Sequence, residues 1–88
     1  MPIISSFFGI VIRMYFDDHN PPHFHAEYQG SMAIFRVSDG TCVEGKLPTK
    51  AAAIVGEWAT EHRYELLRDW QLAQEHQPLE KIAGADND

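Results

Sequence analysis

The chain has 88 residues, a formal net charge of −6 and a hydrophobic fraction of 44%, a composition typical of one globular domain with a modest core. Seven Lys and Arg against 13 Asp and Glu argue against nonspecific binding to nucleic acid, which depends on neutralising phosphates. The single cysteine excludes an intrachain disulfide, and no apolar run approaches the roughly 20 residues that span a bilayer, so we expect a cytoplasmic protein without membrane association.

The N-terminal half is rich in Ile, Val, Phe and Tyr, with turn residues between short runs, and this pattern predicts β-strands. Residues 3–8 form the first run, which Gly9 interrupts. Residues 10–16 form the second run, in which Ile10, Ile12 and Met14 share the face assigned to the core. Further strands are predicted at residues 23–28, 32–37 and 42–44, with turns at residues 29–30 and 38–41.

The period of the hydrophobic pattern changes near Pro48, and apolar residues then recur at helical spacing as far as Ala73. Pro78 is predicted to end this helical region. A single helix over residues 48–76 would be about 43 Å long, which exceeds the width expected of such a small domain. We therefore expect two helices with a break near residues 60–62.

Strands followed by helices predict an α+β fold: a small antiparallel β-sheet of four to five short strands in the N-terminal half, packed on one face by two C-terminal helices. Residues 1–83 are expected to form this single domain. Residues 84–88 are small and acidic, and we expect them to be a disordered C-terminal tail.

Three of the five histidines lie in the segment Asp17-Asp18-His19-Asn20-Pro21-Pro22-His23-Phe24-His25. Histidine is the commonest protein ligand of metals. His23 and His25 are two apart on a predicted strand, about 7 Å between Cα atoms on one face, which suits two ligands of one ion. His19, returned by the Pro-Pro turn, is a third candidate, with Asp17 or Asp18 as a fourth. We therefore assign a site for a divalent metal such as zinc to His19, His23, His25 and Asp18.

The turn at residues 29–30 decides which way these histidines face. If it is two residues long, Phe24 pairs with Phe35 and Ala26 with Ala33 on the core face. The opposite face, which we expect to be open to solvent, then carries the histidines of this strand. The same face collects a candidate anion or partner site made of Arg13, Tyr15, Glu27 and Arg36. A slip of one residue would turn the histidines inward.

Two other interpretations of the histidine segment stay open. In one, His19 and Asn20 cap a tight Pro-Pro turn while the two following histidines pack on aromatic side chains. In the other, Arg13 and Arg36 hold an anion such as a phosphate or carboxylate at a metal-free polar site. The sequence does not decide the isomeric state of the peptide bonds before the two prolines.

Several segments closely resemble the bacterial family named domain of unknown function 4160, and the resemblance extends from Met1 to about Ile82. They comprise residues 2–5, 9–16, 18–26, 44–48, 58–70 and 78–82. The run Asn-Pro-Pro-His-Phe-His is the most specific of them. The resemblance implies a small cytoplasmic bacterial protein, often encoded beside a second small family named domain of unknown function 2442, as toxin and antitoxin are. It implies no catalytic residues.

Two hypotheses for the function follow. The first is a small interaction module of toxin–antitoxin type, which binds a small partner protein of the domain of unknown function 2442 type or a second copy of itself. The alternative is a metal-dependent hydrolase-type enzyme, in which His19, His23 and His25 hold a divalent metal that activates water. The acidic balance suits a neutralising or regulatory protein better than one that cleaves RNA.

Overall fold

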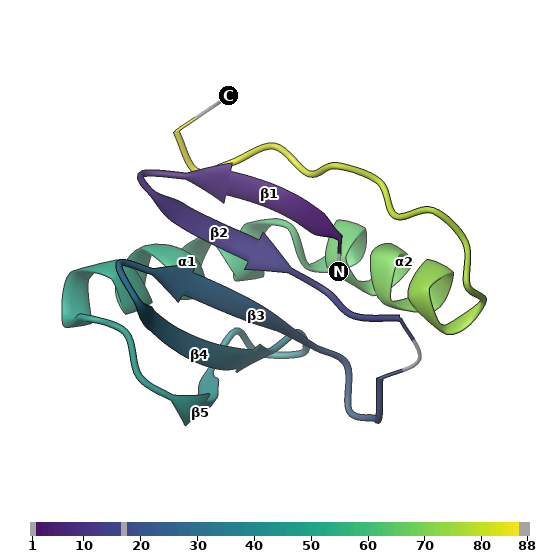
Figure 1. Cartoon of the computed structure of the whole chain (residues 1–88), viewed down its shortest axis with the longest axis horizontal. Coiled ribbons are helices and arrows are strands. Elements are labelled where there is room, and N and C mark those ends of the chain that lie inside the picture. Colours follow the sequence, from purple (N-terminus) through teal and green to yellow (C-terminus); the bar gives the residue numbers. More distant parts are fainter. Residues whose placement is uncertain (1, 17, 87–88) are drawn as a thin grey trace.

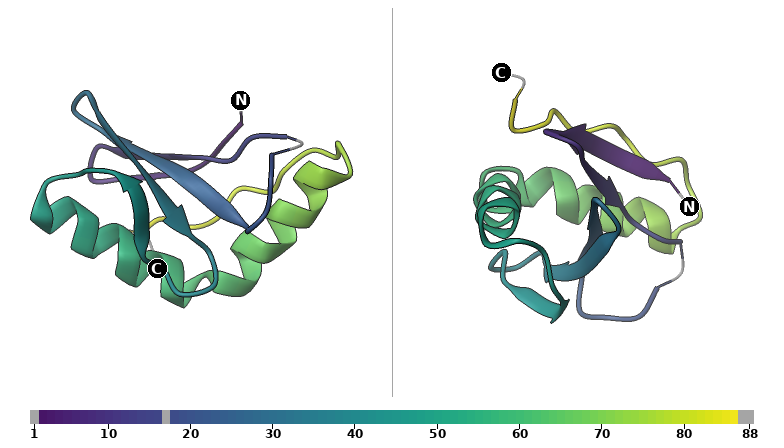
Figure 2. Two further views of the ribbon diagram at one scale, coloured as in Figure 1. Left: turned by 90° about the horizontal axis from the view of Figure 1, so that it is seen from below. Right: turned by 60° about the vertical axis from the view of Figure 1, so that its left-hand side comes forward.

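Five strands followed by two helices make up the part of the chain that the computed structural model describes, residues 2–16 and 18–86. The strands are β1 (Ile3–Phe7), β2 (Ile10–Arg13), β3 (His23–Tyr28), β4 (Ser31–Arg36) and β5 (Cys42–Gly45), and the helices are α1 (Thr49–Glu61) and α2 (Arg63–Gln74). Sequential strands pair antiparallel in the order β1-β2-β3-β4-β5. Both helices cover the same face of this sheet (Figures 1 and 2). The predicted α+β fold is therefore confirmed.

Two-residue turns connect β1 to β2 and β3 to β4. Gln29 and Gly30 have φ values of 47° and 84°, and positive φ at both central positions is characteristic of the type I′ hairpin turn. The predicted register is confirmed, because Phe24 pairs with Phe35 and Ala26 with Ala33. Phe8, predicted as the end of the first strand, instead forms such a turn with Gly9, at φ values of 53° and 79°.

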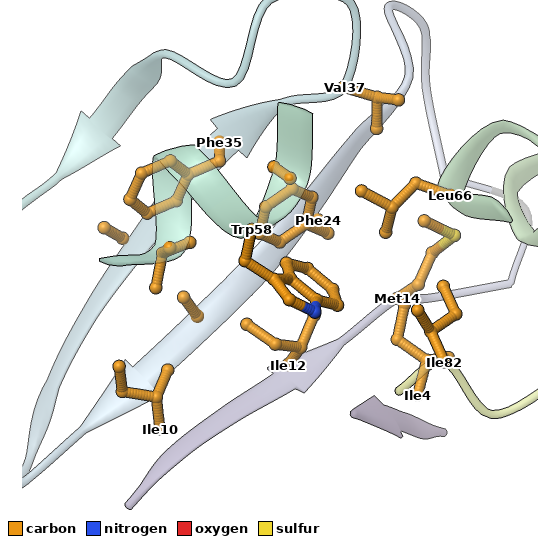
Figure 3. Close-up of a cluster of buried hydrophobic side chains, with 14 of the residues drawn as sticks. Ile4, Ile10, Ile12, Met14, Phe24, Phe35, Val37, Trp58, Leu66 and Ile82 are labelled. Atoms are coloured by element: carbon orange, nitrogen blue, oxygen red, sulfur yellow. The ribbon is translucent and has the colours of Figure 1, made fainter. Parts of the chain in front are cut away.

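Trp58 of α1 lies at the centre of the core, between the helices and the sheet (Figure 3). Its ring centroid is 5.0 Å from that of Phe7 and 5.8 Å from that of Phe24. Its Nε1–H donates to the carbonyl of Ala83 at 2.8 Å, so the same side chain also fastens the C-terminal segment. The core therefore joins three separate parts of the chain through one residue.

The helical region breaks at His62, within the predicted interval, where φ is −112° and ψ is 25°. The break turns α2 toward the end of the sheet where β3 begins (Figure 1). The helix ends at Gln74, before Pro78, because His76 adopts φ 58° and its N–H bonds the carbonyl of Ala73. No helix among the described residues is both long and apolar enough to cross a membrane.

The segment after α2 returns along β1 and covers that edge of the sheet (Figures 1 and 2). Ile82 donates its N–H to the carbonyl of Ile4, and Ser5 Oγ donates to the carbonyl of Ile82, both at 2.8 Å. Asp69 of α2 accepts the N–H of Glu80 at 2.8 Å. The described part of the segment reaches residue 86, residues 87 and 88 lie outside the described residues, and the disordered tail stays a prediction.

Asp69 gives this packing an expected pH dependence. Its side chain is 1% exposed, Oδ2 has no hydrogen-bond partner among the described residues, and burial raises the pKa of the carboxyl group. The folded chain then binds this proton more tightly than the unfolded chain. The stability that Asp69 contributes is therefore present below its unfolded pKa of about 4 and is lost as pH rises through the raised value.

We expect the stability of Asp69→Asn relative to the natural chain to increase as pH rises from 3 to 7, measured by urea unfolding. Asp39→Asn is the control of opposite sign, because hydrogen bonds from Arg36 lower the pKa of Asp39. Its stability relative to the natural chain should decrease over the same range. A difference between Asp69→Asn and the natural chain that does not change with pH would contradict this account.

Candidate functional site

The histidine segment forms the connection from β2 to β3, and its described part begins at Asp18. Asp17, the alternative fourth ligand of the prediction, lies outside the described residues. Gln74 of α2 donates its Nε2–H to the carbonyl of Asp18 at 3.0 Å, which anchors the loop to the helix. The carbonyl of Pro22 accepts the N–H of Val37 at 3.0 Å, so the loop is also fixed to the end of β4. The Asn20–Pro21 peptide bond is cis.

The structure brings Asp18, His23 and His25 together, with one ligand atom of each within 4.8 Å of the other two. Two ligands of one tetrahedral ion, each about 2.0–2.2 Å away from it, are about 3.3–3.6 Å apart. The widest pair of ligand atoms in this group would therefore have to close by no more than about 1.5 Å to share one ion. These three residues are called the Asp-His-His cluster below.

His23 has both ring nitrogens in contact with oxygen atoms. Nδ1 lies 2.8 Å from the carbonyl oxygen of Pro21, and Nε2 lies 2.9 Å from Oδ2 of Asp18. A carbonyl oxygen only accepts hydrogen bonds, so Nδ1 carries a hydrogen. Burial alone would raise the pKa of Asp18, but the N–H of His19 and the charge of His23 outweigh it and lower that pKa. Asp18 is therefore a carboxylate, and it too only accepts.

The contact between Nε2 of His23 and Asp18 consequently requires a cation. A neutral ring whose hydrogen is on Nδ1 presents a lone pair at Nε2, facing a second acceptor at 2.9 Å. Either a second ring proton or a metal ion must lie between them. The bond from Nδ1–H to a backbone carbonyl is the usual outer contact of a metal-binding histidine, because it fixes the tautomer and orients the ring.

His25 is suited to donate a lone pair. Burial lowers its pKa, and the neighbouring charge of His23 acts in the same direction, so the ring is neutral at pH 7. Its Nδ1 is buried and has no hydrogen-bond partner among the described residues. The ring of Tyr15 packs edge-on against it, with centroids 4.4 Å apart. A cation bound at Nδ1 would accept the lone pair of this nitrogen without displacing a hydrogen bond to another described residue.

His19, the third predicted ligand, is placed differently. Its side chain is 86% exposed, and its Nδ1 lies 3.0 Å from Oδ1 of Asp18, on the other carboxylate oxygen from the one that meets His23. The group of three ligand atoms that all lie within 4.8 Å of one another comes from Asp18, His23 and His25 and does not include a nitrogen of His19. The loop thus brings two of the three predicted histidines together and leaves the third at the rim.

The register places His23 on the predicted face of the sheet, but the prediction that this face is open to solvent is wrong at His23. The residue pairs with Arg36 on the face opposite the core, as expected, yet it is only 7% exposed. Trp70 of α2 lies against it, with ring centroids 5.2 Å apart. Because α2 extends to the end of the sheet where β3 begins (Figure 1), its Trp70 can cover the first residue of β3.

The predicted anion or partner residues form separate pairs. Arg13 Nε donates to Glu27 Oε2 at 2.9 Å. Arg36 holds Asp39 through two hydrogen bonds, from NH2 at 2.7 Å and from Nε at 3.2 Å, and these bonds raise the pKa of the guanidinium. Tyr15 packs on His25. Since each arginine already faces a carboxylate, this arrangement does not favour the anion-binding interpretation.

The Asp-His-His cluster forms part of the lining of a pocket of about 340 Å³. The remaining lining residues are His19, Pro21, Ile34, Arg36, Val43 and Glu44. The sequence-based prediction of the site did not include three residues: Glu44, which lines the pocket, Gln74, which holds the loop, and Trp70, which covers His23. The two α2 residues are far from the loop in sequence, and no local pattern indicates their contact.

Comparison with known proteins gives one match. A model of the family described as "Domain of unknown function (DUF4160)" matches residues 9–71. This range includes the Asp-His-His cluster and every strand from β2 to β5. No curated protein and no solved structure matches the chain.

Proposed function

The chain belongs to the DUF4160 family, whose description assigns no activity, and we propose that it binds a divalent metal ion through Asp18, His23 and His25. One carboxylate and two imidazoles are a donor set suited to zinc or ferrous iron. Three protein ligands leave at least one coordination position for water or substrate, which is typical of catalytic rather than structural sites. That position would open into the pocket that the cluster lines.

The observation that carries this proposal is the pair of acceptors at His23 and Asp18. Nδ1–H of His23 is committed to the Pro21 carbonyl, so either a second ring proton or a metal ion must lie between Nε2 and the carboxylate, and the proposal assigns a metal ion to this position. The neutral ring of His25, with its unpartnered Nδ1, supplies the third donor.

Titration calorimetry of the untagged, chelator-treated chain with zinc tests the proposal. We expect one zinc per chain, with affinity lowered at least about a hundredfold by Asp18→Asn or by His25→Ala, because each removes a ligand. His19→Ala and His62→Gln should bind as the natural chain does, since His62 pairs with Glu65 at the helix break. Equal affinities for all five proteins, or no binding, would overturn the proposal.

A second candidate is the interaction module of toxin–antitoxin type, acting in the bacterial cytoplasm. It is favoured by two apolar side chains on the side of the sheet that the helices do not cover, Met32 at 48% and Val43 at 50% exposure. All of β5, the edge strand to which Val43 belongs, is exposed. The partner would be a small protein of the domain of unknown function 2442 type encoded next to this chain, or a second copy.

Co-expression with the neighbouring gene product tests this candidate. The two proteins should co-purify, and replacing Met32 and Val43 together by Ser should separate them. Failure to co-purify, together with a monomeric chain in sedimentation and no effect of either protein on growth, would end this second candidate.

A further inference from the structure

Glu44 of β5 lies across the pocket from the Asp-His-His cluster. It pairs with Ile34 of β4, and Ile34 pairs with His25 of β3, so the three side chains form one row across the sheet. Both glutamate and histidine line the same pocket, with Ile34 as its floor between them. Strands are about 4.8 Å apart, so two strand spacings, about 10 Å, separate the Cα atoms of His25 and Glu44. This leaves room for a metal-bound water and a small substrate between the two side chains.

A β-bulge gives Glu44 this orientation. The register shifts between Ile34 and Phe35, so that Phe35 pairs with Cys42 while Ile34 pairs with Glu44. Without the bulge, the pairing of Phe35 with Cys42 would continue so that Ala33 pairs with Glu44. Ala33 is 1% exposed and lies on the core face, so the Glu44 side chain would then lie on the core face as well. Bulges redirect single side chains and are frequent beside active sites.

The carboxylate of Glu44 is unengaged, unlike the other carboxylate of the pocket. No described residue forms an ion pair or hydrogen bond with it, whereas Asp18 contacts two histidines. Its charge acts on the cluster: burial lowers the pKa of His25, and Glu44 is one of the carboxylates that oppose this shift. An exposed carboxylate that lines the same pocket as the Asp-His-His cluster, and that has no partner among the described residues, is available to act as a general base there.

The charges of the pocket indicate the substrate. A divalent ion with Asp18 and Glu44 sums to zero, and the guanidinium of Arg36 is already held by Asp39. A phosphate or carboxylate substrate would therefore find no free cation other than the metal. The apolar side chains of Ile34, Val43 and Pro21 favour a small neutral group instead.

We propose that Glu44 is the general base of a metal-dependent acyl hydrolase whose substrate is a small neutral ester; the inference rests on the proposed metal site. Glu44 takes a proton from the metal-bound water, whose oxygen forms a bond to the carbonyl carbon. The tetrahedral intermediate then breaks its bond to the alcohol oxygen, which receives the proton from Glu44. One ester and one water give one acid and one alcohol, with no oxidant or reductant.

Hydrolysis of p-nitrophenyl acetate by the zinc-loaded chain tests this assignment, with p-nitrophenyl phosphate as the anionic comparison. We expect hydrolysis of the acetate above that of zinc alone and of the chelator-treated chain, and none of the phosphate. Glu44→Gln should lower the acetate rate at least about a hundredfold, because an amide cannot accept the proton. It should bind zinc as tightly as the natural chain does. Glu57→Gln, a change at an exposed carboxylate of α1 on the helical side of the sheet, should keep the full rate.

The outcomes separate the two proposals. A Glu44→Gln protein that holds zinc and hydrolyses the acetate at the natural rate overturns the role of Glu44 and leaves the metal site standing. Bound zinc without hydrolysis above the controls, or with preference for the phosphate, overturns the acyl-hydrolase assignment. A natural chain that binds no zinc overturns the metal site, and the inference fails with it.

Discussion

Saturating zinc is expected to raise the unfolding temperature of the natural chain by about 10–20 °C and to leave that of His25→Ala almost unchanged. At a free zinc concentration of 100 times Kd, a ligand that binds only the folded state adds about 2.7 kcal/mol to the free energy of unfolding. For a domain of this size, each kcal/mol corresponds to about 4–8 °C. The ion would join Asp18 of the loop to His23 and His25 of β3, so unfolding would have to release it.

Without zinc, His25→Ala should unfold close to the natural chain. Its Nδ1 makes no hydrogen bond with a described residue, so the substitution removes packing against Tyr15 but leaves no buried polar partner behind. Differential scanning calorimetry with chelator and with zinc measures both effects. The same zinc-induced rise in His25→Ala as in the natural chain would show that the stabilising ion binds elsewhere. His62→Gln is the matched histidine control and should retain the full rise.

Trp58→Ala is expected to lower the free energy of unfolding by about 3–5 kcal/mol, the usual cost of removing a large aromatic side chain from a core. Trp58 is 1% exposed and contacts the ring of Phe24 (Figure 3). Its ring also contacts that of Phe7. It also holds the carbonyl of Ala83. A small domain has about 5–15 kcal/mol in total, so the variant should be partly unfolded or close to it at 37 °C.

Urea unfolding followed by circular dichroism measures this loss. Trp58→Phe should lose less, since it keeps an aromatic ring and gives up the hydrogen bond to Ala83. Tyr64→Ala provides the surface control, because that side chain is 77% exposed and its removal should change stability by about 0.5 kcal/mol or less. A Trp58→Ala protein as stable as Tyr64→Ala would contradict the central position of Trp58 in the core.

Local signals made most of the fold predictable. Gln29–Gly30 sets the register of β3 and β4. A two-residue loop with glycine at its second position favours the type I′ turn, and this turn fixes which residues of the two strands pair. The helix break near His62 followed from length alone. Phe8–Gly9 was missed because a phenylalanine is disfavoured at φ 53°, and nothing in the sequence distinguishes this turn from a strand end.

The candidate site likewise contains residues that local patterns predict and residues that only tertiary contacts bring there. Asp18, His23 and His25 lie within eight residues, and strand alternation places both histidines on one face. Trp70 covers His23 through a contact between distant parts of the chain, which periodicity does not reveal. Glu44 depends on the bulge in β5, and a shift of one residue transfers a side chain from one face of a sheet to the other. Residue patterns thus predicted the members of the Asp-His-His cluster, while tertiary packing decided their surroundings.

The most direct test of the account is an anomalous difference map at the zinc edge, from crystals of the natural chain grown with one equivalent of zinc. The proposed site predicts one strong peak about 2.0–2.2 Å from a carboxylate oxygen of Asp18 and from one ring nitrogen each of His23 and His25. A strong peak at other residues, or no peak while Nε2 of His23 keeps its contact with Asp18, would contradict it.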